Sequence, residues 1–363
     1  MTFLARTRSG PGTLALVAVG ALCALVPAAS VTHGAAGPDV ARVPLAGEPC
    51  AAGTTSTGPV TDSVLVVSVD GLNPHALTRL GRAGTPTLHR LLDEGASTLN
   101  ARTAVELTVT LPNHTGMVTG RRIDAARGGH GVNWNVDRAR PATVRRAAGE
   151  RVDSVFTAVS RAGGSTALFA SKSKFSLWRR SWGQDLDRVV IREDNQQLVR
   201  SLLRDLRTRD RDLRFVHLSA PDAAGHRHGF MGRDYLDAVR DVDRWLGRVV
   251  RAIDRDGAPA ATLLLTSDHG GGRSTGHSQR NKPANYRVPF LVRGPGADAG
   301  ADLYALNPAY QDPGRGRPGY AEERQPVRNG MVANVALDLL GLPPVPGSVL
   351  GADERLLLTA PTG

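Results

Sequence analysis

The sequence predicts an α/β fold in which a largely parallel central sheet is flanked by helices. Several short apolar runs have the length and composition of buried strands, and segments with helical spacing of apolar residues lie between them. This alternation is typical of parallel sheets, because each parallel connection has to cross back over the sheet. Three of the predicted strands also end in an acidic residue, at the sheet edge where α/β proteins bind ligands.

The predicted elements follow one another in a regular order. SVLVVSVDG (63–71) is the first strand, and TPTLHRLLDEG (85–95) is a helix with Pro86 in its first turn and Gly95 as its stop. The further predicted strands are 165–171, 213–220, 261–267 and 286–293. The further predicted helices are 152–162, 194–209, 234–255 and 328–341. Residues 294–326 are dense in Gly, Pro, Arg and Asp, which predicts a long surface excursion.

The N-terminus differs in composition from the rest of the chain. Arg6 and Arg8 precede the apolar run TLALVAVGALCALVPAA, and a small-residue site follows, so residues 1–30 predict a secretory signal peptide. The alternative is an uncleaved N-terminal membrane anchor, and no other segment is apolar enough to span a membrane. Residues 31–58 predict a linker rich in Ala, Gly, Pro and Thr, and residues 59–355 a single catalytic domain.

Composition limits the possible partners. The net charge of +11 suits an anionic substrate, but the arginines are spread along the chain and aromatic residues are only 4%. We therefore expect a small phosphate-ester substrate and no stable nucleic-acid partner. Of the two cysteines, Cys23 would leave with the signal peptide, so Cys50 cannot form an intrachain disulfide.

Ligand-type side chains follow three of the strands. Asp70 ends the first, Asp222 follows 213–220, and Asp268 and His269 follow 261–267. An aspartate after a strand is usually only a turn or a helix cap. Three of them at the converging ends of parallel strands, with histidine partners, instead indicate one metal site.

The histidines near Asp222 leave alternatives. In APDAAGHRHG, Asp222 and His226 are four residues apart and share one face if the segment is helical. His228 is the rival, but it would point away from Asp222 on the same helix. His217 lies inside a strand, where a core or supporting role is expected.

Five motifs in a fixed order carry a more specific signal. They are DG at 70–71, TLPNHTGMVTG at 110–120, HGVNWN at 130–135, PDAAGH at 221–226 and SDHGG at 267–271. This succession resembles the type I phosphodiesterase/nucleotide pyrophosphatase branch of the alkaline phosphatase superfamily. The resemblance implies an alkaline-phosphatase-like three-layer fold and two divalent metal ions, with zinc expected.

The resemblance also implies roles for individual residues. Asp70, Asp268 and His269 would bind one metal, and Thr110 would be the nucleophile and contact that metal. Asp222 and His226 would bind the other metal, with a third ligand from a later histidine. Asn135 would hydrogen-bond a phosphoryl oxygen.

The chemistry of a threonine hydroxyl agrees with the nucleophile role that the resemblance implies for Thr110. A threonine hydroxyl needs a base or a metal to become a nucleophile at neutral pH, and two metals can stabilise both oxygens of an in-line displacement. Thr110 also precedes a helical-looking segment, whose N-terminus could face an anion. The alternatives are an ordinary helix cap at Thr110 and a nucleophilic Thr108. Asn113 and His114 are expected to support the site rather than to react.

The third ligand of the second metal departs from many relatives. Their last metal histidine lies far downstream, whereas no histidine follows His277 in this chain. His277 is therefore the candidate, only eight residues after His269. This compact spacing leaves the substrate class open.

The lysines are few. The chain has three, and Lys172 and Lys174 both fall in FASKSKFS after a predicted strand. They are candidate substrate-binding residues near the phosphate, although a surface loop would also hold lysines.

The predicted function is a secreted two-metal phosphohydrolase that cleaves a phosphodiester or pyrophosphate through a phosphothreonine intermediate. The alternatives are a phosphomonoesterase and an inactive, polyanion-binding homologue. A cofactor-independent phosphoglycerate mutase is opposed by the signal peptide, and a sulfatase by the lack of a C/S-x-P-x-R motif at the nucleophile.

Overall fold

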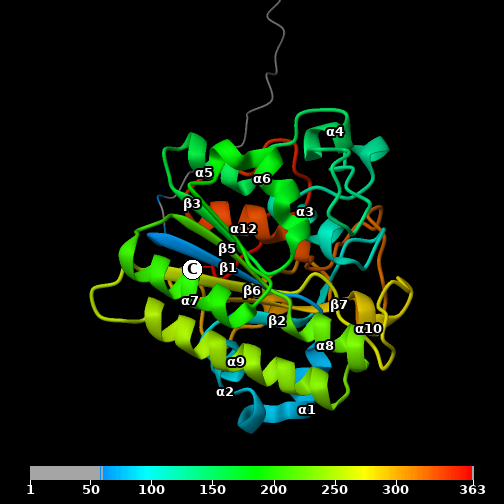
Figure 1. The fold of residues 1–363 in the computed structure, drawn as a ribbon, viewed down its shortest axis with the longest axis vertical. Coiled ribbons are helices and arrows are strands. Elements are labelled where there is room, and N and C mark those ends of the chain that lie inside the picture. Colours follow the sequence, from blue (N-terminus) through cyan, green and yellow to red (C-terminus); the bar gives the residue numbers. More distant parts are fainter. Residues whose placement is uncertain (1–57, 59, 362–363) are drawn as a thin grey trace, which may run out of the picture. The chain divides into compact units, whose positions relative to one another are not determined.

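A seven-stranded mixed sheet runs through the centre of the protein, in a computed structural model that describes residue 58 and residues 60–361 (Figure 1). The strands lie in the order β2-β7-β6-β1-β5-β3-β4. Strands β6, β1, β5, β3 and β4 are parallel to one another, and β7 is antiparallel to both β6 and β2. The strands are β1 Ser63–Val69, β2 Ala96–Arg102, β3 Thr166–Ala170, β4 Arg188–Ile191, β5 Leu213–Leu218, β6 Ala261–Thr266 and β7 Arg287–Arg293.

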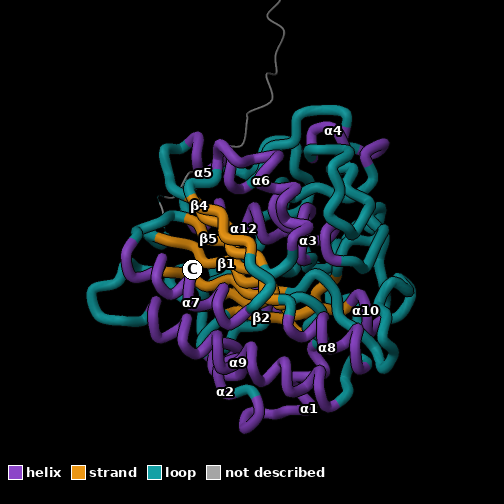
Figure 2. Tube along the Cα trace, in the orientation of Figure 1, coloured by secondary structure: helices purple, strands orange, loops and turns teal. Residues whose placement is uncertain are grey.

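Helices cover both faces of the sheet and make a three-layer α/β architecture, as predicted (Figure 2). Helices α3, α5, α6 and α12 pack on one face, and α1, α2, α7 and α9 on the other. The helices are α1 Pro74–Gly84, α2 Pro86–Asp93, α3 Thr110–Thr119, α4 Val144–Ala148, α5 Val155–Arg161, α6 Ser176–Trp182, α7 Asn195–Thr208, α8 Ala220–His228, α9 Arg233–Ile253, α10 Pro283–Tyr286, α11 Leu303–Leu306 and α12 Val332–Leu339.

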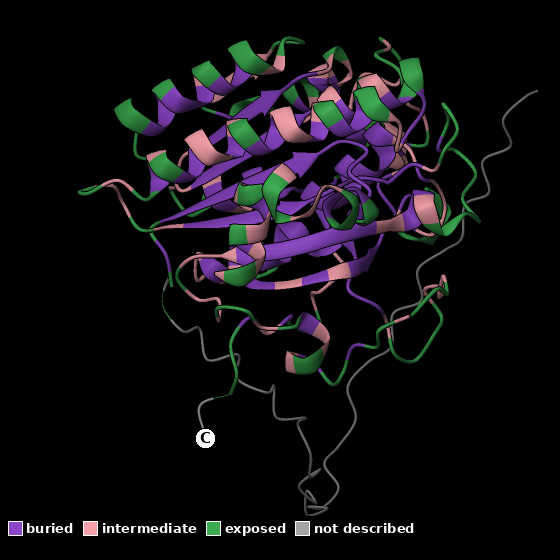
Figure 3. Cartoon of the chain, turned by 90° about the horizontal axis from the view of Figure 1, so that it is seen from below, coloured by how far each residue is buried: buried purple, intermediate pink, exposed green. Residues whose placement is uncertain are grey.

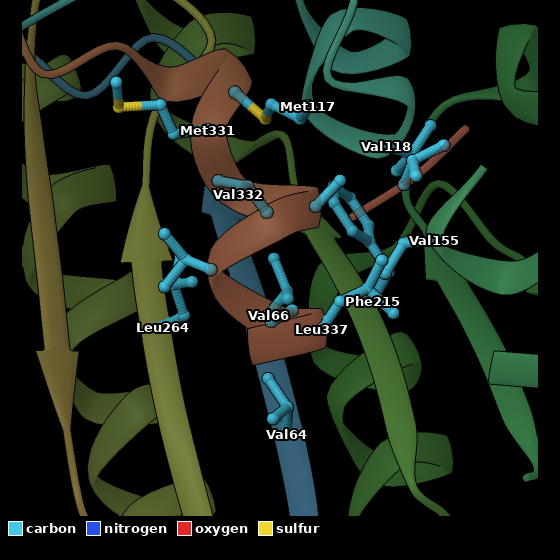
Figure 4. Close-up of a cluster of buried hydrophobic side chains, with 14 of the residues drawn as sticks. Val64, Val66, Met117, Val118, Val155, Phe215, Leu264, Met331, Val332 and Leu337 are labelled. Carbon is cyan, nitrogen blue, oxygen red and sulfur yellow. The ribbon is translucent and has the colours of Figure 1, made fainter. Parts of the chain in front are cut away.

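Alternation along the central strand separates the two hydrophobic cores. Val66 pairs in register with Phe215 and Leu264, and these three side chains pack under α12 (Figure 4). The next residue, Val67, belongs to the core on the opposite face. Successive side chains of a strand point to opposite faces, so a continuous apolar run suits a strand that is covered on both sides. Figure 3 shows the resulting buried interior and the exposed outer sides of the helices.

The structure adds elements that the sequence pattern did not indicate. Strand β2 and helix α1 fall in segments left without a predicted element, and so does the short strand β4. Strand β2 has polar residues at several positions because it pairs only with β7, at the edge of the sheet. The predicted 294–326 excursion contains one short helix, α11, and is otherwise irregular.

The N-terminal predictions concern residues outside this description. The predicted signal peptide (1–30) and nearly all of the predicted linker (31–58) lie outside the described residues. Within the part that is described, no helix combines the length and apolar character that crossing a membrane requires.

Candidate metal centre

Three adjacent strands deliver acidic residues to one edge of the sheet. Asp70 follows β1, Asp222 lies in α8 directly after β5, and Asp268 follows β6. Strands β6, β1 and β5 are neighbours and run parallel, so their carboxyl ends meet. Gly71, with φ of 73°, makes the turn after β1 and brings its backbone against Asp222, where a Cβ would come within 3.2 Å of the Asp222 Cα.

Asp70, Asp268 and His269 form one cluster, which we call the Asp70 group. All three are fully buried, and their ligand-type atoms lie within 4.8 Å of one another. His269 Nε2 is 3.3 Å from Asp70 Oδ1 and 3.2 Å from Asp268 Oδ2. The structure thus brings together the three residues predicted for one metal.

Asp222, His226 and His277 form a second cluster, the Asp222 group. Both Nε2 atoms lie 3.4 Å from Asp222 Oδ1, and they are 3.0 Å from each other. Helix α8 places Asp222 and His226 one turn apart, as the spacing predicted. The rival His228 is exposed and belongs to neither group.

The hydrogen bonds of the three grouped histidines define their tautomers. The Nδ1 atoms of His226, His269 and His277 lie 2.7–2.8 Å from the backbone carbonyls of Thr275, Gly270 and Thr108. A carbonyl only accepts, so each Nδ1 carries the proton and each Nε2 presents a lone pair. The Nε2 atoms of His226 and His277 face each other at 3.0 Å, an arrangement that a proton or a metal ion between them and Asp222 would stabilise.

Unpaired buried atoms concentrate at this site. Among the described residues, the buried side-chain polar atoms without a hydrogen-bond partner include only three carboxylate oxygens, and all three are here. They are Asp70 Oδ1, Asp222 Oδ1 and Asp268 Oδ2, and His269 Nε2 is also unpaired. Buried polar groups are normally satisfied, so these atoms fit bound cations. Carboxylate and imidazole ligands that each offer one atom are a set that zinc uses.

The pKa shifts of the grouped aspartates and histidines also favour a bound cation. Burial raises the pKa of Asp268 well above its usual range, and the Asp70 and Asp222 carboxylates add to the effect. Burial also lowers the pKa of His269, and it lowers that of His277 to about 2, with a contribution from His269. Neutral imidazoles beside a surplus of carboxylates form a site that a cation would stabilise.

Lys172 lies between the two groups. Its Nζ is 2.6 Å from Asp70 Oδ2 and 2.6 Å from Asp222 Oδ2, and 3.5 Å from Thr110 Oγ1. Burial would lower the pKa of Lys172, but the two carboxylates outweigh it and raise the pKa above its ordinary value. The ammonium is therefore charged, and it was predicted only as a substrate contact.

Thr110 begins helix α3 beside this cluster. The residue is 1% exposed, and Val109 before it is extended, so the hydroxyl sits at the helix N-terminus. Asn135 Oδ1 accepts hydrogen bonds from the Leu111 amide at 2.9 Å and from Lys174 Nζ at 3.0 Å. The oxygen of Asn135 thus caps the helix, and its Nδ2 is the atom left to donate to a ligand.

The neighbours of Thr110 have other partners. The Thr108 hydroxyl donates to the His277 carbonyl at 2.7 Å, so this rival nucleophile is occupied. Asn113 pins the preceding loop through the Ala104 amide and the Leu107 carbonyl. His114 Nδ1 donates to the Thr110 carbonyl, and the Ser68 hydroxyl donates to its Nε2.

Two supporting residues were not predicted as a pair. Ser68 and His217 are opposite each other in the β1–β5 register, and both are fully buried. His217 Nε2 lies 2.9 Å from Asp70 Oδ2. The available signal was a polar residue near the carboxyl end of each of two largely apolar strands, shortly before the candidate ligand residues.

Curated relatives resemble parts of the chain. Alkaline phosphatase PhoD of Zymomonas mobilis is 42% identical over 60 residues, which are 16% of this chain and 10% of that protein. A 2,3-bisphosphoglycerate-independent phosphoglycerate mutase of Cereibacter sphaeroides is 35% identical over 104 residues, 26% of this chain and 18% of the mutase. The chain thus spans less than a fifth of the length of either relative.

Solved structures resemble the chain over most of its length. Murine ectonucleotide pyrophosphatase/phosphodiesterase 5 superimposes with a TM-score of 0.59 and 16% identity, over 82% of this chain and 100% of that one. Its inactive threonine-to-alanine variant in complex with AMP gives a TM-score of 0.60 and 14% identity, over 81% and 99%. At this identity the likeness establishes the fold, which is the expected one.

A family-level match covers more than half of the chain. Residues 64–285 match the type I phosphodiesterase / nucleotide pyrophosphatase family, and this segment contains all five motifs and both metal-ligand groups. The match confirms the predicted resemblance and, at the level of the family, the predicted class of phosphoric-ester hydrolase. The chain belongs to the type I phosphodiesterase / nucleotide pyrophosphatase family.

Proposed function

We propose that this protein is a two-metal hydrolase that cleaves a phosphodiester or pyrophosphate bond of a small molecule, with Thr110 as nucleophile. The observation that carries the proposal is the pair of ligand groups beside Thr110, all buried except His226, in which one oxygen of every carboxylate is unpaired. Asp70, Asp268 and His269 would hold one ion, and Asp222, His226 and His277 the other. His277 completes the second group although it stands close to His269 in the sequence.

Divalent ions, zinc by the ligand chemistry, would supply positive charge that favours the Thr110 alkoxide and stabilises the attacking and leaving oxygens of the displacement. Within the described part of the chain, the only side chain that contacts the Thr110 hydroxyl is that of Lys172, so no general base is placed there. Both ring nitrogens of His114 are engaged, by Ser68 and the Thr110 carbonyl, and burial holds its pKa well below the usual range. Charge stabilisation is thus the available route to a reactive threonine.

The side chains then have distinct tasks in the reaction. Thr110 Oγ1 loses its proton to solvent and attacks phosphorus, the bond to the leaving oxygen breaks, and that oxygen takes a proton from water. The resulting phosphothreonine keeps the second ester group of a diester, and a water molecule then hydrolyses it, which restores the Thr110 hydroxyl and releases the phosphate product. The charged Lys172 ammonium, 3.5 Å from Thr110 Oγ1, stabilises negative charge on that oxygen. Asn135 Nδ2 and the Lys174 ammonium bind the non-bridging oxygens from the other side, where Asn135 is held by Leu111.

Known relatives support this proposal. The murine structural neighbour was solved with AMP as an inactive threonine-to-alanine variant, which accords with a catalytic threonine and a nucleotide-type substrate. A phosphomonoesterase is the second candidate, favoured by the match to alkaline phosphatase PhoD and by two ammonium groups that suit a dianionic phosphate.

The test is hydrolysis of three chromogenic esters: p-nitrophenyl phosphate, bis(p-nitrophenyl) phosphate and thymidine 5′-(p-nitrophenyl phosphate). The zinc-loaded protein, a chelated sample and the same sample after zinc is restored are compared. We expect both diesters to be cleaved faster than the monoester, with loss on chelation and recovery with zinc. A faster monoester reaction would favour the second candidate, and no zinc-dependent cleavage of any ester would refute the proposal.

We further propose that the protein is secreted, on the basis of the charged and apolar segment in residues 1–30. Expression of the full chain in a secreting bacterial host tests this proposal. The expected product is extracellular and begins close to residue 31. A protein that stays with the membrane fraction and keeps residues 1–30 would instead support the N-terminal anchor.

A further inference from the structure

His217 contacts the Asp70 group from β5, and its Nε2 meets the same oxygen of Asp70 as the Lys172 ammonium does. The side chain is fully buried in β5, and its ring packs against Phe175, with centroids 4.5 Å apart, and against His114 at 4.8 Å. Its Nε2 reaches Asp70 Oδ2 at 2.9 Å. No ligand-type atom of His217 belongs to either metal group.

The surroundings of Nδ1 decide the tautomer of His217. The backbone amide of Ser171 donates to Nδ1 at 3.3 Å, so Nδ1 is an acceptor, and the Ser171 hydroxyl lies 3.1 Å away. The proton is therefore on Nε2, and Nε2 donates to Asp70. The three ligand histidines carry their proton on Nδ1, so His217 is the reverse of them.

The two oxygens of the Asp70 carboxylate therefore have different surroundings. Oδ2 receives His217 Nε2 and the Lys172 ammonium at 2.6 Å, whereas Oδ1 has no hydrogen-bond partner. Ser171 in turn is held from β5, because the Ser219 amide donates to its hydroxyl at 2.8 Å. A chain of bonds from Ser219 through Ser171 and His217 thus orients the carboxylate.

We propose that His217 is a positioning residue. Its hydrogen bond holds Asp70 Oδ2 away from the metal of the Asp70 group, so that Asp70 Oδ1 faces this metal. The inference rests on the proposed metal centre. Removing the donor frees Oδ2 and lets the carboxylate turn, which weakens binding at this group and leaves the Asp222 group unchanged. Outer partners of this kind typically change metal affinity about 10- to 100-fold.

Two amide substitutions of His217 distinguish a role in positioning Asp70 from a role in packing. In His217→Gln the side-chain amide nitrogen can take the place of Nε2 and still donate to Asp70, whereas in His217→Asn it reaches only the place of Nδ1. His130→Asn is the matched control, since His130 is equally buried but bonds only the Val132 amide. Zinc affinity is measured by competition with a chromogenic chelator, and coordination by the visible spectrum of the cobalt-loaded proteins.

We expect His217→Asn to lose about 10- to 100-fold affinity for one of two zinc equivalents and to show an altered cobalt spectrum. His217→Gln and His130→Asn should retain both affinities within about threefold, whatever their thermal stability. Equal affinities in His217→Asn and His217→Gln would overturn the role of His217. Absence of zinc binding in the unaltered protein would instead overturn the metal centre itself.

A measurement on the unaltered protein covers the case in which the Asn variant does not fold. Long-range nitrogen–proton NMR spectra of the zinc-loaded protein distinguish the two imidazole tautomers. The expected result is a proton on Nε2 of His217. A proton on Nδ1 of His217 would overturn the proposal, since Nε2 could then not donate to Asp70.

Discussion

Buried aspartates occur at both ends of the sheet, but the number of cationic partners around them differs. At the amino end of β5, Asp205 of α7 is buried and accepts from Arg211 Nε at 3.0 Å and Arg214 Nε at 2.9 Å, with Arg188 at 3.6 Å. At the carboxyl end, Asp70 and Asp222 share the ammonium of Lys172, and no lysine or arginine among the described residues pairs with Asp268. Each of these three carboxylates keeps one unpaired oxygen.

The different surroundings of these carboxylates distinguish a charge cluster that stabilises the fold from a candidate ligand-binding site. Burial alone does not distinguish the two ends, because the carboxylates are equally inaccessible at both. What distinguishes them is the supply of positive charge. Three arginines surround the single carboxylate of Asp205, whereas the one ammonium of Lys172 faces the three carboxylates at the other end. A buried cluster with surplus ligand atoms is a place where the protein requires something from outside the chain.

The largest expected effect lies at the carboxyl end and concerns activity. Thr110→Ala should lower turnover of the preferred ester by about 10³-fold or more, because it removes the attacking oxygen. Zinc content and thermal stability should stay near those of the unaltered protein, since the carboxylate and imidazole groups of both clusters remain. The measurement is steady-state turnover with zinc determined in the same sample. Thr108→Ser is the control, and full turnover by Thr110→Ala would exclude this nucleophile.

The second effect lies at the amino end and concerns stability. Asp205→Asn should cost about 3 kcal/mol of unfolding free energy, because it leaves buried guanidinium groups without their counter-charge. Urea unfolding measures this change, and exposed Asp210→Asn is the matched control. Turnover per folded molecule should not change. A variant as stable as the control would show that the arginines need no carboxylate.

The same chemical change at the other end should have the opposite sign. In chelator-treated protein, Asp268→Asn should raise the unfolding free energy by about 1 kcal/mol, the scale of one unsatisfied buried acceptor. The new amide can donate to His269 Nε2, which lies 3.2 Å from the replaced oxygen. Zinc affinity should fall at the same time. If Asp268→Asn destabilises the metal-free protein as Asp205→Asn does, the contrast between the two ends fails.

The smallest effect concerns Asp243 of α9, a buried carboxylate that faces backbone amides rather than cations. It accepts from Leu88 at 2.7 Å and Thr87 at 3.2 Å, at the start of α2. Burial raises its pKa above 3.8, against the effect of these amides. The folded protein therefore binds the proton more tightly than the unfolded chain does. The stability due to this residue is present below the unfolded pKa and is lost as pH rises through the folded value.

Thermal unfolding of the unaltered protein and Asp243→Asn, from about pH 4 to pH 7, tests this assignment. The melting temperature of the unaltered protein relative to the variant should fall across that interval by a few degrees at most. A constant difference would mean that Asp243 has no raised pKa. A relative rise with pH would mean that the amides outweigh burial and lower it.

Much of the candidate site was predictable because the positions of its residues relative to the predicted strands and helices bring them together. Asp70, Asp222 and the Asp268–His269 pair each follow a strand, and parallel strands bring their carboxyl ends together. The i, i+4 pair of Asp222 and His226 needs only one helical turn. Periodicity predicted the strands that are apolar on both faces, but it did not indicate β2, whose edge position tolerates polar residues.

What the sequence by itself determined is therefore the fold class, the parallel strands and the set of candidate ligand residues, because these depend on local periodicity and residue type. The tertiary structure alone decided which oxygen of each carboxylate is taken, how Lys172 bridges the two groups, and that Asn135 turns its oxygen to Leu111. It also decided the tautomers, since the partners of His217 and His277 come from Ser171 and Thr108 on other elements. Such contacts form between segments far apart in the chain, where spacing along the sequence carries no information about distance or direction.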